Sequence, residues 1–190
     1  MRIRSVLLLI ASMTFATSDA FTHPLPYSTI FLDVGREQVA AELRLPAAQF
    51  EIGFGKPVPR TSEMLSAGLR LDIARYVADH LSASDRSGTV WRTEVRDIEL
   101  VMEPGMGHSE AVVAHLYVTA ALVPPSQPTP RNFVLRTDLV VHELLTHRLF
   151  VYLRRDWKVK AASVAPFILG RITYRTREVA VDLFEESEAS

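Results

Sequence analysis

The chain has 190 residues, 48% of them hydrophobic, with a formal net charge of −1 and no cysteine. This length suits one domain with its own hydrophobic core. The near-zero net charge excludes a broad basic field that would attract nucleic acid or an anionic membrane. The absence of cysteine excludes disulfides, thiolate metal sites and a cysteine nucleophile.

Residues 1–20 have the features of an export signal. A basic start is followed by a mostly apolar run at residues 6–16 and by a small-x-Ala cleavage site at residues 18–20. The apolar run is shorter than the roughly 20 residues that a membrane-spanning helix needs. We therefore expect cleavage after Ala20, an exported mature chain beginning at Phe21, and no direct insertion of that chain into a membrane.

The first elements of the mature chain are two strands and a short helical turn. Residues 27–34 and 38–45 are apolar-rich runs separated by a glycine-containing turn, which is typical of a hairpin. The second run alternates apolar and polar residues, as a half-buried strand does, and ends at Pro46. Residues 47–54 predict a helical turn, after which glycines and prolines mark a loop.

Residues 62–81 predict one amphipathic helix. Apolar residues from Leu65 onward recur at three- and four-residue spacing, and charged residues occupy the other face. We expect Thr61 or Ser62 to cap the first turn. His80 falls at the end of the helix, where an imidazolium suits the helix dipole.

The rest of the chain shows the apolar alternation of successive β-strands. Predicted strands cover residues 90–102, 112–122, 133–141 and 149–153, and residues 163–183 supply one or two closing strands. The phase of the alternation changes near residues 96–97, which predicts a β-bulge.

This pattern predicts a mainly β fold, an antiparallel immunoglobulin-like β-sandwich with one inserted amphipathic helix at about residues 62–81. Residues 21–184 form this single domain, between the signal peptide at residues 1–20 and an acidic tail at residues 185–190. No internal repeat or long flexible linker divides the sequence.

Two histidines in the last third of the chain are the first candidate metal ligands. His142 and His147 are five residues apart in strand-like sequence, so they do not form the zinc-protease motif, which needs a spacing of four on a helix. In a hairpin with a two-residue turn, their Cβ atoms would lie about 5 Å apart on one face, close enough for the two imidazoles to share a metal ion. A three-residue loop aligns the apolar residues better but turns the imidazoles to opposite faces. The alternative interpretation is two separately hydrogen-bonded histidines.

His23 is a different candidate, because cleavage after Ala20 makes it the third residue of the mature chain. The new amine, two backbone amides and the imidazole can bind Cu(II) or Ni(II) in a square plane. The alternative is that residues 23–24 simply lead the chain into its first strand.

No pattern for catalysis accompanies these histidines. The serines lack the nucleophile-elbow pattern, and the sequence has no phosphate-binding glycine loop. We therefore expect a protein without enzymatic activity.

Several segments, in this order, resemble the exported N-terminal region of HupE/UreJ-like membrane proteins. They are residues 23–28 (HPLPYS), 31–34 (FLDV), 39–46 (VAAELRLP), 137–142 (TDLVVH), 146–147 (TH) and 154–157 (RRDW). Together they extend the resemblance over most of the mature chain.

That family is described as hydrogenase or urease accessory proteins linked to nickel supply. The resemblance implies a periplasmic location and a role in nickel or copper handling, with His23, His142 and His147 in family-like positions. Family members usually continue into several transmembrane helices, and this sequence stops before such a segment. The resemblance therefore implies a membrane-protein partner that supplies the transmembrane half, and transport is not assigned to this chain.

Two functional hypotheses follow. In the first, the chain is a periplasmic accessory domain that binds nickel or copper through some of these three histidines. In the second, it is a metal-free interaction module that docks on a membrane or envelope partner through strand edges and the proline-rich loop at residues 124–130. Neither hypothesis includes nucleic acid as a partner.

Overall fold

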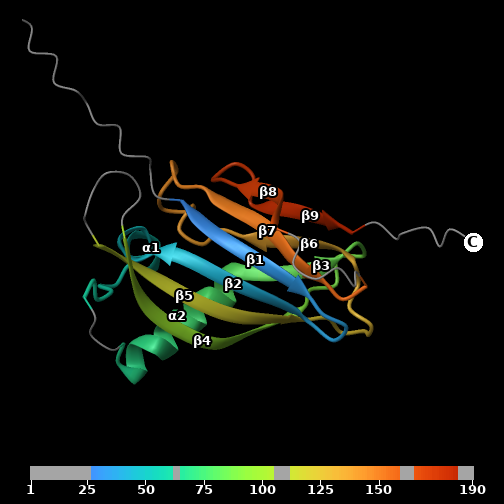
Figure 1. Ribbon diagram of the computed structural model, residues 1–190, viewed down its shortest axis with the longest axis horizontal. Helices are drawn as coiled ribbons and strands as arrows, with labels where there is room; N and C mark the ends of the chain where they lie inside the picture. The colour runs from blue at the N-terminus through green and yellow to red at the C-terminus, as the bar shows by residue number, and fades with distance from the viewer. Residues whose placement is uncertain (1–26, 62–64, 105–111, 159–164, 184–190) are drawn as a thin grey trace, which may run out of the picture.

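The computed structural model describes residues 27–61, 65–104, 112–158 and 165–183, and the protein is mainly β (Figure 1). Its strands are β1 (Ser28–Val34), β2 (Val39–Pro46), β3 (Leu81–Asp85), β4 (Arg92–Pro104), β5 (Val112–Val123), β6 (Asn132–Thr137), β7 (Leu149–Asp156), β8 (Phe167–Ile172) and β9 (Glu178–Asp182). The helices in these ranges are α1 (Ala47–Phe54) and α2 (Ala67–His80). The strands form a six-stranded sheet, in the order β4-β5-β2-β1-β7-β8, and a three-stranded sheet, in the order β3-β6-β9.

The predicted first hairpin is confirmed. β1 and β2 pair antiparallel with Val34 opposite Val39, and the Gly35 N–H donates to the Gln38 carbonyl at 2.9 Å. Alternate residues of both strands are buried, as expected when one face of a sheet covers a core. On its other edge β1 pairs with β7 in parallel, so the larger sheet is mixed and not wholly antiparallel.

Two helices follow β2. α1 begins directly after Pro46 and ends at Gly55, whose φ of 72° lies in the left-handed region that glycine tolerates. α2 is capped by Ser66, whose Oγ accepts a hydrogen bond from the Leu69 N–H at 3.2 Å. Within the described part of the chain, neither helix is long and apolar enough to cross a membrane.

The predicted helix over residues 62–81 is of the right kind but begins too early. Because the helix starts at Ala67, its cap is not Thr61 or Ser62. Leu65 precedes the helix and is nevertheless buried, so its apolar side chain belongs to the core without belonging to the helical face.

Most of the later strands match the sequence pattern. The register of β4 against β5 shifts between Val95 and Asp97, where the alternation changes phase, so the predicted bulge is confirmed. β8 and β9 are the closing strands. The predicted signal peptide at residues 1–20 and acidic tail at residues 185–190 lie outside the described residues.

The predicted strand over residues 133–141 is wrong in its second half. β6 ends at Thr137, and the chain then turns. Leu139, Val140 and Val141 are fully buried within this turn. A continuous apolar run does not distinguish a buried strand from a buried turn, which explains the error.

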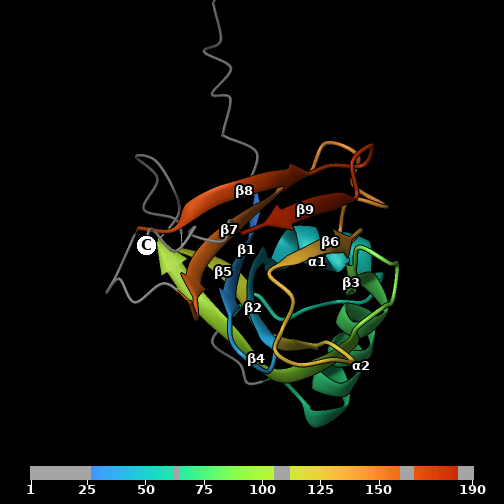
Figure 2. The same cartoon turned by 90° about the vertical axis from the view of Figure 1, so that its right-hand side faces the viewer.

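One buried cluster of apolar side chains joins both sheets and both helices. Leu43 and Val151 of the larger sheet, Leu135 of the smaller sheet, Phe50 of α1 and Ile73 of α2 are all fully buried in it. Burial of each such side chain contributes about 1.5–3 kcal/mol. The helices and the smaller sheet lie on one side of the larger sheet (Figures 1 and 2), and no described element covers its other face.

Candidate functional site

A histidine–aspartate cluster lies where α2, β3 and β6 meet. It consists of His80, the last residue of α2, and of Asp138 and His142 in the turn after β6. β3 begins directly after α2, and its first residue, Leu81, pairs with Thr137 at the end of β6. This pairing brings His80 beside Asp138, although the two are 58 positions apart in the sequence.

Asp138 holds both imidazoles by their Nδ1 atoms. Its Oδ1 atom lies 2.7 Å from His80 Nδ1, and its main-chain oxygen lies 2.8 Å from His142 Nδ1. Carboxylate and carbonyl oxygens accept hydrogen bonds, so each Nδ1 carries a proton and donates it. A neutral imidazole protonated at Nδ1 has no proton on Nε2. In the neutral form of each ring, Nε2 therefore has a free lone pair that can bind a metal ion.

Aromatic rings fix the positions of the two imidazoles. The ring centroids of His80 and His142 are 4.7 Å apart, with an interplanar angle of 14°. The Tyr76 ring lies 4.3 Å from the His80 ring, and Phe50 and Phe54 of α1 pack against Tyr76 at 5.3 and 5.4 Å. Each such aromatic contact contributes about 0.5–1.5 kcal/mol, so the rings are held before any ligand binds.

The turn that carries Asp138 and His142 has a strained backbone. Val140 has a φ of 64°, in the left-handed region that β-branched residues rarely adopt. Its N–H donates to Tyr76 Oη at 3.3 Å, and a Cβ atom on Gly53 would lie 2.8 Å from the Val140 Cα. Burial raises the pKa of Tyr76 to about 12, so this hydroxyl stays neutral. Strain of about 1–3 kcal/mol persists only where the surroundings fix it, and it concentrates at functional sites.

Asp138 has a second partner, Arg177, which precedes β9. Arg177 Nη1 lies 3.3 Å from Asp138 Oδ2, and the Arg177 side chain is 44% exposed. An ion pair of this exposure contributes at most about 1 kcal/mol, so an incoming cation can displace the guanidinium. The His80 and Asp138 side chains are 26% and 29% exposed, and the cluster is therefore open to an ion and to water.

The predicted hairpin between His142 and His147 is wrong, because β6 belongs to the smaller sheet and β7 to the larger one. His147 is 3% exposed, and its Nε2 lies 2.8 Å from Ser28 Oγ at the start of β1. Burial lowers the pKa of His147 to about 4, so the ring is neutral at pH 7. The two histidines are separately hydrogen bonded, as the alternative interpretation expected, and His147 is not part of the cluster.

His23 lies outside the described residues, so its role as a ligand stays a prediction. No sequence pattern indicates His80 or Asp138 as ligands. The one local signal was that His80 ends a helix and Asp138 follows a run of strand residues. Their contact depends on the pairing of β3 with β6, which no local pattern determines.

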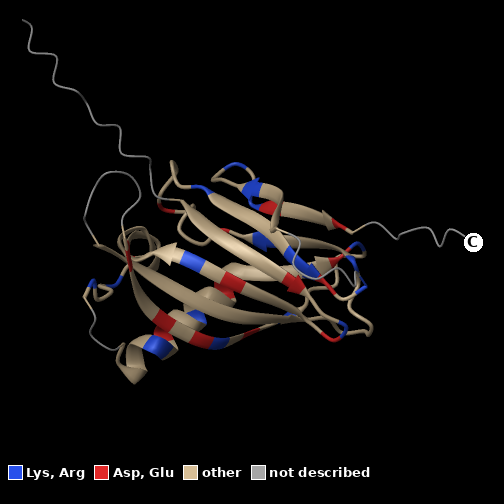
Figure 3. Cartoon of the chain, in the orientation of Figure 1, with Lys and Arg blue, Asp and Glu red and all other residues tan. Residues whose placement is uncertain are grey.

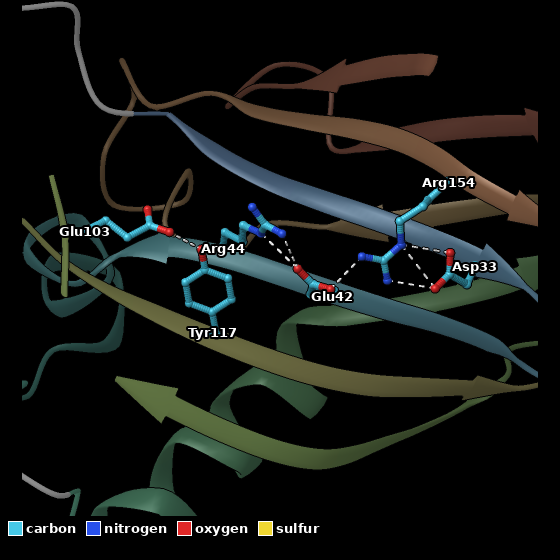
Figure 4. A network of polar contacts seen from close by, with 6 residues as sticks. All are labelled: Asp33, Glu42, Arg44, Glu103, Tyr117 and Arg154. Carbon is cyan, nitrogen blue, oxygen red and sulfur yellow. Dashed lines mark hydrogen bonds and ion pairs between the residues drawn. The ribbon is translucent and has the colours of Figure 1, made fainter. Parts of the chain in front are cut away.

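A separate polar network lies on the uncovered face of the larger sheet (Figure 4). Its side chains are Asp33, Glu42, Arg44, Glu103, Tyr117 and Arg154. Arg154 donates to both oxygens of Asp33 at 2.7–3.2 Å and to Glu42 at 2.7 Å. Burial raises the pKa of Glu42, but hydrogen bonds from Arg154 and Arg44 outweigh it and lower that pKa overall. These charges satisfy one another, and we interpret the network as structural.

The composition of the histidine–aspartate cluster suits a late first-row metal ion. Imidazole nitrogens favour Zn(II), Ni(II) and Cu(II), whereas Mg(II) and Ca(II) prefer oxygen ligands. One ring nitrogen of each histidine and one carboxylate oxygen of Asp138 lie within 4.8 Å of one another. An ion bound at 2.0–2.2 Å from each ligand needs them within about 4.3 Å, so the three ligand atoms must move slightly closer together when the ion binds. Comparisons with models of known protein families and with curated proteins found no match, so this geometry carries the assignment of function.

Proposed function

We propose that the chain is an exported, non-enzymatic accessory domain that binds one divalent transition-metal ion at His80, Asp138 and His142. The observation that carries this proposal is that Asp138 accepts a hydrogen bond from the Nδ1 atom of each histidine, which leaves the two Nε2 atoms for a metal ion. Metal-ligating histidines usually donate their second nitrogen to a carboxylate or a carbonyl, which fixes the tautomer and the ring orientation.

The proposal keeps the kind of function predicted from the sequence and revises the ligands. His142 stays a proposed ligand. His147 is buried against Ser28, so His80 and Asp138 replace it as proposed ligands. The resemblance to HupE/UreJ-like proteins supports nickel as the first ion to test and copper as the second. The periplasmic location and a membrane-protein partner are proposed on the same resemblance.

We also propose that this mainly β fold is an immunoglobulin-like β-sandwich. Two sheets that contribute to one buried cluster support a sandwich. The parallel contact of β1 with β7 and the helices between β2 and β3 are additions to that plan.

Asp138 can take either of two roles when an ion binds. Its Oδ1 atom stays on His80 Nδ1 and orients the ring, or its carboxylate turns to the ion as a third ligand. His80 and His142 supply the nitrogen ligands in both cases, and water completes the coordination because the cluster is partly exposed.

Calorimetric titration with Ni(II) tests the proposal. The titrated chain begins at Phe21 and carries His23→Ala, because the new N-terminus would otherwise bind the same ion. We expect saturable binding of one ion per chain. His80→Ala and His142→Ala should each lower the affinity at least tenfold, because each removes one nitrogen ligand.

His115→Ala is the matched control. His115 lies on β5, on the face of the larger sheet that points away from the helices and the smaller sheet, and it is not part of the cluster. This variant should bind Ni(II) like the parent chain. The absence of saturable binding, or an unchanged affinity in both His80→Ala and His142→Ala, would exclude this site.

A further inference from the structure

Two stretches at one edge of the molecule carry arginine without acidic residues. Residues 148–155 contain three arginines and residues 167–177 contain another three, and neither stretch contains an aspartate or a glutamate. Arg154 and Arg177 form ion pairs with carboxylates of the fold. The other arginines of this edge are available for contacts outside the chain.

Three of these arginines are exposed around β8. Arg148 precedes β7, Arg171 lies in β8 and Arg175 lies in the turn to β9. None of them forms an ion pair within the described part of the chain. Arg171 pairs with Phe150, and Arg148 lies two residues before Phe150, so both arginines share the uncovered face of the larger sheet. Positive charge is therefore concentrated locally, although the whole chain has a net charge of −1.

Exposed apolar side chains lie among these arginines. Phe167, Ile168 and Tyr174 are 54%, 51% and 44% exposed. β8 is the last strand of the larger sheet, and successive residues point to opposite faces, so Phe167 and Ile168 flank an open edge. β8 runs along the outer margin of the molecule in both views (Figures 1 and 2). Figure 3 shows basic segments there and an acidic one at the start of β9, where Glu178 pairs with Arg136. We name this surface the arginine–aromatic edge and define it by Arg148, Phe167, Ile168, Arg171, Tyr174 and Arg175.

The opposite edge of the same sheet is different. On β4, both Arg92 and Arg96 pair with Glu94, so positive and negative charges alternate and satisfy each other. The bulge of β4 adds further protection of that edge. β8 contains one charged residue, Arg171, and no carboxylate, so the balance of opposite charges on β4 is absent from β8.

We propose that the arginine–aromatic edge docks the protein peripherally on the surface of an anionic lipid bilayer. Basic residues near such a surface each raise partitioning about fivefold through attraction to anionic headgroups. Tyrosine and phenylalanine suit the headgroup level, and an exposed isoleucine suits the boundary with the acyl chains. The arginines, the aromatic residues and the isoleucine of this edge therefore suit the charged headgroups and the apolar boundary beneath them.

A second copy of the chain fits this edge poorly. Self-association through this surface would bring the exposed arginines of two copies near one another, and residues 148–155 and 167–177 contain no carboxylate to neutralise them. The charge complementarity of the edge therefore favours an anionic surface over self-association.

Vesicle sedimentation tests the proposal. The chain beginning at Phe21 contains every described element and lacks the apolar residues 6–16, which would bind vesicles by themselves. We expect binding to vesicles of phosphatidylcholine with phosphatidylglycerol, no binding to phosphatidylcholine alone, and release by high salt. Arg171→Gln with Arg175→Gln should lower the partition coefficient about 25-fold.

Two matched controls separate the edge from general charge and hydrophobicity. Arg75→Gln with Arg92→Gln removes the same charge from exposed positions on α2 and β4 and should leave binding nearly unchanged. Ile168→Ser should lower partitioning about five- to tenfold, whereas Leu71→Ser should not, although both parent side chains are 51% exposed.

Equal binding to the two kinds of vesicle, or an equal loss in the two arginine double variants, would overturn the proposal. A dimer that Ile168→Ser converts to a monomer, with vesicle binding unchanged, would show instead that a second copy covers the edge. Urea unfolding of each variant checks that it keeps the fold of the parent chain.

Discussion

His80 and Asp138 bind each other twice. The Asp138 N–H donates to the His80 carbonyl at 3.3 Å, and the His80 Nδ1 atom lies 2.7 Å from Asp138 Oδ1. The main-chain contact continues the pairing of β3 with β6 by one position. The side-chain contact sets the tautomer of the imidazole. The strand pairing that joins α2 to the smaller sheet therefore also prepares a metal ligand.

Replacing Asp138 by asparagine tests this relationship. An ionised carboxylate accepts hydrogen bonds only, whereas the amide of Asp138→Asn can either accept from His80 Nδ1 or donate to it. The proton of the His80 ring is then no longer confined to Nδ1. We expect the affinity for Ni(II) to fall about 10- to 100-fold. Nitrogen NMR of His80 should show a shift from the Nδ1–H form towards a mixture of tautomers.

Glu143→Gln serves as the matched control for Asp138→Asn, because Glu143 is an exposed acidic residue of the same turn and is not in the cluster. It should change neither the affinity nor the His80 spectrum. An Asp138→Asn variant that binds Ni(II) like the parent would show that the carboxylate neither orients nor binds.

Gly53 should tolerate no side chain. A Cβ atom there would lie 2.8 Å from both the Val140 Cα and Tyr76 Oη, so backbone or ring must move. We expect Gly53→Ala to lower the free energy of unfolding by about 1–3 kcal/mol in urea denaturation and to weaken Ni(II) binding. Gly68→Ala is the control, since nothing lies within 4 Å of its Cβ position, and it should raise stability by up to about 1 kcal/mol. Equal effects of the two substitutions would contradict the close contact between α1 and the turn.

The sequence predicted those features of the fold that depend on neighbouring residues. The first hairpin and the bulge near residues 96–97 follow from alternation within a short segment, and both are confirmed. The parallel contact of β1 with β7 joins segments far apart in the chain, so no local pattern indicates it. The apolar residues 139–141 suit a strand or a buried turn equally well, and tertiary contacts decide between them.

The cluster was predicted only in part for the same reason. His142 was proposed as a ligand from its spacing to His147, but the hairpin behind that argument does not exist. The positive φ of Val140 is rare for a β-branched residue and is maintained by contacts with Tyr76 and Gly53. The net charge of −1 likewise gave no indication of the arginines around β8, because a net charge does not show where in the fold the charged residues lie.

His147 should make the protein less stable in acid. Its pKa is 6.5 in an ordinary environment and about 4 in the folded chain, because burial disfavours the charged ring. The unfolded chain therefore binds the proton first, and stability is fully present above about pH 6.5 and falls as the pH drops towards 4. Linkage gives a loss of about 2 kcal/mol between about pH 7.5 and pH 5.

Urea unfolding at several pH values measures this loss. His147→Gln cannot titrate and can keep a hydrogen bond to Ser28, so its stability should depend less on pH over the same range. Parallel pH dependences of the parent and of His147→Gln would assign the acid sensitivity to other groups.

Arg154 should stabilise the larger sheet more than a surface arginine does. It bridges Asp33 on β1 and Glu42 on β2 from β7, and all three side chains are less than one third exposed. Arg154→Met leaves the two carboxylates without this partner, so burial then dominates and the pKa of Glu42 should rise. We expect the free energy of unfolding at neutral pH to fall by about 1–2 kcal/mol. Arg154→Lys should restore only part of it, because a single ammonium lacks the fork that reaches two carboxylates.

Arg136→Met is the matched control for Arg154→Met. Arg136 also pairs with a carboxylate across two strands, but its side chain and that of Glu178 are 58% and 54% exposed. Water and salt screen such a pair, and its loss should be barely measurable. The difference between the two arginines should shrink as the pH falls and the carboxylates of the network become protonated, because the charge that Arg154 neutralises is then absent. Equal and small effects of the two substitutions would show that the network in Figure 4 contributes no more than a single surface ion pair.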